Sequence, residues 1–162
     1  MIKDGTEIEL DQFPWSILIK ATFKNGNDLS LFSCGGSLIS RLYVLTAAHC
    51  VFRPGDTLVG IDITLIEYDE NCVEIERKPN CADSVLLQVE KVVHHPGFND
   101  EKLLHDIALI KLQEYTIARY ITPVCLPKID VDHLHLVNLP LVVAGWKRNG
   151  PHLTPLCSRP YW

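Results

Sequence analysis

The chain has 162 residues, of which 47% are hydrophobic and 22% charged, a composition typical of one globular domain or two very small ones. The formal net charge of −5 gives no electrostatic basis for binding nucleic acid or an anionic membrane. No apolar stretch approaches the roughly 20 residues of a membrane span, and the N-terminus lacks the apolar core of a signal peptide.

Short apolar or alternating runs between turn signals predict an all-β chain, because helix-length periodicity is nearly absent. The first predicted strand covers residues 15–20 and ends before a turn at 24–27. The later predicted strands are residues 36–40, 43–46, 61–67, 86–93 and 107–112, with one helical turn at 47–51. This series of short strands favours an antiparallel barrel.

Two motifs in this series indicate acyl-transfer chemistry. Residues 45–50 read Leu-Thr-Ala-Ala-His-Cys, and residues 106–110 read Asp-Ile-Ala-Leu-Ile. In a Ser-His-Asp triad the histidine accepts the serine proton, while a buried aspartate fixes its tautomer and stabilises the imidazolium. The motifs therefore predict His49 as the base and Asp106 as its acid, the alternative being that His49 is only a core histidine.

Four further motifs surround these two in a fixed order. They are Phe-Pro-Trp at 13–15, Cys-Gly-Gly-Ser-Leu-Ile at 34–39, Pro-Val-Cys-Leu-Pro at 123–127 and Ala-Gly-Trp at 144–146. Together the six motifs resemble the trypsin/chymotrypsin family of serine endopeptidases over about residues 2–146. The resemblance implies two antiparallel β-barrels, the first essentially complete in residues 1–126 and the second mostly missing. Residues 127–146 would be the crossover and the opening strand of the second barrel, from about 139 to 146.

The resemblance also implies how four of the six cysteines pair. Cys34 and Cys50 correspond to the disulfide that holds the family's histidine loop. Cys72 and Cys81 flank a polar segment, and a bridge closing such an extra loop resembles the arthropod clip-domain subgroup. Six cysteines in a short chain, if paired, indicate an oxidising compartment, so a secreted protein is expected.

The other two cysteines have no evident partner. In the clip-domain subgroup the counterpart of Cys125 bridges to a cysteine in an N-terminal pro-region, and no such region occurs in this sequence. Cys157 fits no family position. We expect both to be unpaired, paired with each other by chance, or bonded to another chain.

The nucleophile of the triad is absent from this sequence. The family places it in a Gly-Asp-Ser-Gly-Gly loop, and no serine of the chain has that context. Ser158 alone lies beyond the crossover, and it lacks the glycines that would let backbone N–H groups form an oxyanion hole. Since the walls of the specificity pocket belong to the same missing half, we expect the chain to be inactive alone.

The family resemblance implies a serine-type endopeptidase of an extracellular cascade, with protein substrates or a cascade protein as partners. The alternative is a non-catalytic protease homologue that binds partner proteins through its barrel surface. The intact His49 and Asp106 favour the first interpretation.

Metal sites have weaker support, and no other cofactor is expected. Glu67 matches a ligand of a calcium-binding loop in some relatives, and Asp83 is a second candidate ligand. The favoured alternative is a solvated acidic loop. His94 and His95 face opposite sides if they lie on a strand, and His133 and His135 have no evident third ligand.

The C-terminal residues 147–162 depart from the family pattern after Trp146. Restoring two G nucleotides after the Trp146 codon permits Gly-(Asn/Ser)-Glu-Thr-Gly-Pro-Thr-Ser-Pro, which is closer to the family's loop. We therefore interpret residues 147–162 as an aberrant tail with an out-of-frame origin. The alternative is a genuine short isoform, and genomic sequence through this codon would decide between the two.

Overall fold

The structure is a computed structural model, and it describes residues 6–7, 12–68, 82–116, 121–128, 142–149 and 152–158. The elements in chain order are β1 (Thr6–Glu7), β2 (Ser16–Asn25), β3 (Asp28–Ser40), β4 (Tyr43–Thr46), the 3-10 helix η1 (Ala48–Cys50), β5 (Thr57–Tyr68), β6 (Ala82–Leu87), β7 (Val89–His94), β8 (Ala108–Leu112), β9 (Val143–Asn149) and β10 (His152–Ser158). Every strand pair is antiparallel. The predicted all-β antiparallel class is thus confirmed.

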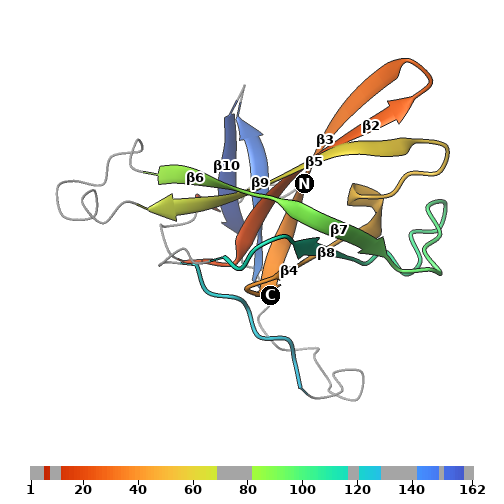
Figure 1. Cartoon of the computed structure of the whole chain (residues 1–162). Helices are drawn as coiled ribbons and strands as arrows, with labels where there is room; N and C mark the ends of the chain where they lie inside the picture. Colours follow the sequence, from red (N-terminus) through yellow and green to blue (C-terminus); the bar gives the residue numbers. More distant parts are fainter. Residues whose placement is uncertain are drawn as a thin grey trace.

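The larger sheet has seven strands in the order β6-β5-β2-β3-β4-β8-β7. Its two edge strands, β6 and β7, are separated in sequence by Gln88 alone. β6 pairs with β5 at one edge of the sheet and β7 pairs with β8 at the other edge, so one continuous run of chain connects the two edges. Figure 1 shows β6 and β7 following one another in green. This connection curls the sheet around a common core, as in a barrel.

The smaller sheet has three strands in the order β1-β10-β9. It lies against the larger sheet at Trp146, whose indole Nε1–H donates a 3.0 Å hydrogen bond to the carbonyl oxygen of Ile17. Since Ile17 is in β2 and Trp146 in β9, this bond ties the two sheets together.

Alternate side chains of the strands fill the interior of the larger sheet. In β2, Ile17, Ile19 and Phe23 are at most 1% exposed, and their neighbours across the sheet include Ile63 and Leu65 of β5. Alternate residues of β8 (Ala108, Ile110 and Leu112) complete the same core. Burying each Leu, Ile or Phe side chain of this set contributes about 1.5–3 kcal/mol, so this interior holds together the strands that carry the candidate site.

The close approach of β3 to its neighbours requires a glycine at position 36. A Cβ atom there would lie 3.0 Å from Ile19 Cδ1 and from Val44 Cγ1, and 3.2 Å from the backbone oxygen of Leu45. Both side chains are fully buried, so neither has room to move aside.

We expect Gly36→Ala to destabilise the fold by about 1–3 kcal/mol through overpacking. Urea unfolding of the variant would measure the loss. Gly60→Ala is the matched control, because a Cβ there meets only Thr22, at an ordinary 3.6 Å, and it should change the free energy of unfolding little. Equal effects at the two positions would contradict the packing argument.

No helix among the described residues is both long and apolar enough to cross a membrane.

Candidate active site

Strand register brings the two predicted triad residues together. Strand β4 pairs with β8 so that Thr46 lies opposite Ala108. His49 follows Thr46 by one 3-10 turn, and Asp106 precedes Ala108 by two residues. The antiparallel pairing therefore places both side chains at the same end of the two strands, although 57 positions separate them in sequence.

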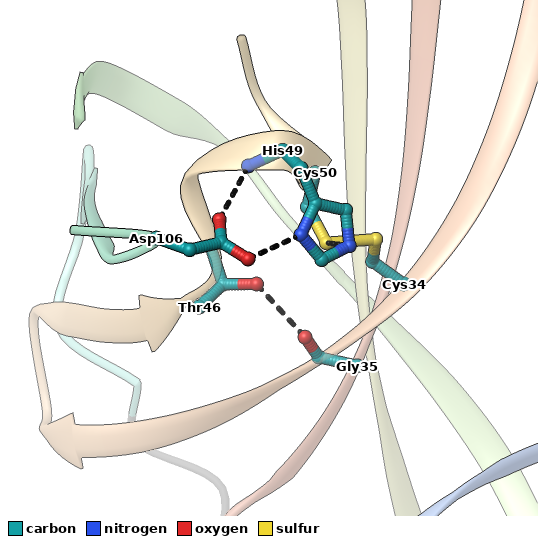
Figure 2. The surroundings of a disulfide bond; sticks show 6 residues. All are labelled: Cys34, Gly35, Thr46, His49, Cys50 and Asp106. Carbon is teal, nitrogen blue, oxygen red and sulfur yellow. Dashed lines mark hydrogen bonds and ion pairs between the residues drawn. A yellow bond between two sulfur atoms is a disulfide. The ribbon is translucent and has the colours of Figure 1, made fainter. Parts of the chain in front are cut away.

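Both carboxylate oxygens of Asp106 bind His49. Oδ1 accepts a 2.9 Å hydrogen bond from the backbone N–H of His49, and Oδ2 lies 2.7 Å from its ring Nδ1. Figure 2 shows the two contacts from the same carboxylate. A carboxylate can only accept, so the bond from Nδ1 places the ring proton there and leaves Nε2 as the acceptor nitrogen.

The ionised form of Asp106 is favoured in the folded chain. Burial alone would raise the pKa of this carboxyl. Hydrogen bonds from the His49 backbone and ring, the charge of His49 and a hydrogen bond from the Ala48 backbone outweigh burial and lower the pKa below 3.8.

This lowered pKa predicts an acid-labile contribution to stability. A carboxyl whose pKa is lowered in the folded chain stabilises the fold fully at pH values above its pKa in the unfolded chain. This stabilisation is lost as the pH falls through its pKa in the folded chain. We therefore expect the free energy of unfolding of wild type to exceed that of Asp106→Asn by about 1.5–3 kcal/mol at pH 6, the range for hydrogen bonds to charged groups. The gap should shrink as pH falls below about 4. Chemical denaturation across this range measures the gap, and a constant gap would contradict the assignment.

The histidine turn is anchored to β3 from two sides. Cys34 in β3 and Cys50 in η1 form a disulfide, and the Thr46 hydroxyl donates a 2.8 Å hydrogen bond to the carbonyl oxygen of Gly35. Figure 2 shows both links beside His49. The sequence motif identified the histidine, but it contained no signal for the role of Thr46.

The ring of His49 is accessible from solvent. Its side chain is 50% exposed, against 21% for Asp106. Cys34, which is bonded to Cys50 next to His49, lines a hollow of about 430 Å³ whose walls come from β2, β3, β4 and β9. The site therefore has a fixed histidine with one side open to solvent, and the disulfide beside it borders this hollow.

The other predicted site residues that the structure describes lie on other segments of the chain. Glu67 and Asp83 lie directly opposite one another in the β5–β6 pair, and the calcium site there stays a prediction. Cys125 is exposed and makes no disulfide with a residue that the structure describes, whereas Cys157 lies in β10 opposite Ala144. Cys72, Cys81, His133 and His135 lie outside the described residues.

The two adjacent histidines 94 and 95 make separate ring contacts. His94 stacks on Phe52 at 4.2 Å between centroids, and His95 stacks on His105 at 4.7 Å. His95 Nδ1 also accepts a hydrogen bond from the Gly97 backbone. The two rings therefore pack against different partners.

An antiparallel barrel that presents a histidine with its Nδ1 held by an aspartate has the arrangement expected of the base and acid of a serine peptidase. A family model described as Trypsin matches residues 2–156, a span that includes part of the predicted tail. The chain therefore belongs to the trypsin family.

Curated relatives from insects agree with this membership. The chain is 39% identical over 137 residues to "CLIP domain-containing serine protease B9" of Anopheles gambiae, covering 80% of this chain and 34% of the relative. It is 34% identical over 158 residues to "Serine protease 7" of Drosophila melanogaster, with 91% and 39% covered. It is 35% identical over 156 residues to "Phenoloxidase-activating factor 1" of Holotrichia diomphalia, with 91% and 42% covered. The chain thus spans between about a third and two fifths of these relatives' lengths.

The fold has a matching solved structure. "HL collagenase" superposes with a TM-score of 0.70 at 26% identity, covering 98% of this chain and 63% of the collagenase chain.

Proposed function

We propose that the chain carries the base and acid of a secreted serine-type endopeptidase that acts on protein substrates in an extracellular cascade. The observation that supports this most is the double contact of Asp106 with His49, at 2.9 and 2.7 Å. Relatives named as clip-domain and phenoloxidase-activating proteases support the cascade role, and the Cys34–Cys50 disulfide supports an oxidising compartment.

In this role His49 Nε2 would accept the proton of a serine hydroxyl as that oxygen attacks the substrate carbonyl. The same nitrogen would return the proton to the leaving amine, while Asp106 stabilises the imidazolium between the two steps. The 162 residues contain no serine in a Gly-Asp-Ser-Gly-Gly context. We therefore propose that this chain by itself does not hydrolyse peptides.

A fluorophosphonate probe tests the inactivity of the chain. We expect no covalent labelling of the 162-residue protein and no cleavage of peptide amides, because no serine in its sequence has the Gly-Asp-Ser-Gly-Gly context of the family's nucleophile. Intact-mass spectrometry measures labelling, with trypsin as the positive control. A labelled chain whose adduct disappears in Ser158→Ala would identify an unexpected nucleophile and defeat the proposal.

The competing function is that of a non-catalytic homologue that binds partner proteins. The geometry of the His49–Asp106 pair supports the enzymatic interpretation, since a binding surface has no need of a fixed imidazole tautomer.

A further inference from the structure

Two sulfur atoms and a ring nitrogen meet beside the candidate active site. The Sγ atoms of Cys34 and Cys50 and a ring nitrogen of His49 all lie within 4.8 Å of one another, and among the described residues no other group of three such ligands occurs. The sulfur atoms are joined as a disulfide. We propose that reduction of this disulfide creates a zinc site with Cys34, Cys50 and His49 Nε2 as ligands.

The distances suit a tetrahedral ion. Zn–S bonds of about 2.3 Å and a Zn–N bond of about 2.0–2.1 Å at the tetrahedral angle place nitrogen and sulfur roughly 3.5 Å apart. His49 Nε2 and Cys50 Sγ are 3.5 Å apart in the structure. The two sulfurs must separate to roughly 3.8 Å by the same geometry. Side-chain rotation achieves this between residues whose Cα atoms are 6.0 Å apart.

Asp106 prepares the histidine for a metal. It binds Nδ1 at 2.7 Å, so the lone pair of the neutral ring is on Nε2, on the side of Cys50. Histidines that bind zinc commonly donate their other ring N–H to a carboxylate in this way. The oriented imidazole that serves the proposed base is therefore also a preformed zinc ligand.

The surroundings allow a reductant and an ion to enter. Cys50 is 4% exposed, but Cys34 is half-buried and lines the hollow of about 430 Å³ together with Gly35 and Trp146. His49 is open on the solvent side. Three protein ligands leave a fourth position for water, as in Cys₂His zinc sites.

A dithiol can serve as the reductant of the disulfide. The dithiol gives two electrons and two protons to the Cys34–Cys50 bond and leaves as a cyclic disulfide. Zinc then displaces the two thiol protons as it binds the thiolates. Because the metal uses Nε2, it excludes the proposed base function of His49. The inference goes beyond that function and does not depend on it.

The test is metal titration of the full 162-residue chain, with the other four cysteines (Cys72, Cys81, Cys125 and Cys157) replaced by serine. A phosphine reduces the remaining disulfide, becoming its oxide with oxygen from water. We expect one Co²⁺ per chain, with sulfur-to-cobalt charge-transfer absorption and the intense visible bands of tetrahedral cobalt, and displacement by Zn²⁺. The oxidised protein should show no such spectrum.

Two variants distinguish the proposed site from binding by thiols alone. Asp106→Asn should weaken zinc binding about 10–100-fold, the usual effect of losing an outer partner of a ligating histidine, and His49→Gln should weaken it more. His95→Gln, at an exposed histidine stacked on His105, is the matched control and should leave affinity unchanged. The thiols of an unfolded chain would bind zinc with the same affinity whichever residue is at position 106. Equal affinity in Asp106→Asn and wild type, or no tetrahedral cobalt spectrum, would overturn the proposal.

Discussion

A chimera that joins residues 1–146 to the C-terminal half of a trypsin-family relative is expected to cleave peptide amides. Its Asp106→Asn variant should lose about four orders of magnitude in kcat, the loss known for this change in a serine-protease triad. The reason lies in the contact at Nδ1. An amide in place of Oδ2 can donate to Nδ1, which moves the ring proton to Nε2 and removes the acceptor that the serine needs.

The control for this experiment is an aspartate with a similar contact elsewhere. Asp56 accepts a 2.7 Å hydrogen bond from the side chain of Asn25 rather than from a histidine, and Asp56→Asn should leave kcat within about twofold. Steady-state kinetics on a peptide amide measures both variants. If Asp106→Asn retained wild-type kcat while Asp56→Asn also did so, the proposed role of Asp106 would be wrong.

The candidate pair could be predicted from sequence because its motifs are local. His49 and Asp106 each lie in a short run of distinctive residues. What brings them together is the register of Thr46 opposite Ala108, which depends on pairing between strands and cannot be read from either run. The contact from the His49 backbone to Asp106 depends on the same register.

Strand boundaries are hard to predict from sequence where the apolar pattern is weak. The pattern gives no signal for residues 28–35 of β3, because most of their side chains are exposed. Pairing with β2 across the turn at Gly26, whose φ is +58°, holds this part of the strand. Conversely, residues 86–93 read as one strand, but the chain changes partner at Gln88. Local alternation does not record such a change of partner.

The pairing of strands within the predicted tail, residues 147–162, could not be inferred from the family motif. Residues 147–149 extend β9, and residues 152–158 form β10 beside it. Departure from a family motif gave no information on whether these residues can pair as a hairpin. The predicted out-of-frame origin of residues 147–162 is a question about the coding sequence, and it stays a prediction.

Removal of the Cys34–Cys50 disulfide is expected to cost about 3 kcal/mol of folding free energy. The bridge joins residues 16 apart in sequence, and closing a loop of about this length restricts the unfolded chain by that amount. For a chain of this size the loss corresponds to a fall in Tm of roughly 6–12 °C. The variant to use is Cys34→Ser with Cys50→Ala, because a hydroxyl at the buried position 50 would add its own desolvation cost.

Cys125→Ser is the matched control for this variant, since Cys125 is exposed and unbonded, and it should leave Tm within about 1 °C. Differential scanning calorimetry measures both changes. The double variant should also lose the link that holds the His49 turn to β3, so its His49 ring resonances should shift in NMR spectra, whereas those of Cys125→Ser should not. If the double variant had the same Tm as wild type, the Thr46–Gly35 hydrogen bond and the core packing around Ala48 and Val51 would be sufficient to hold the histidine turn.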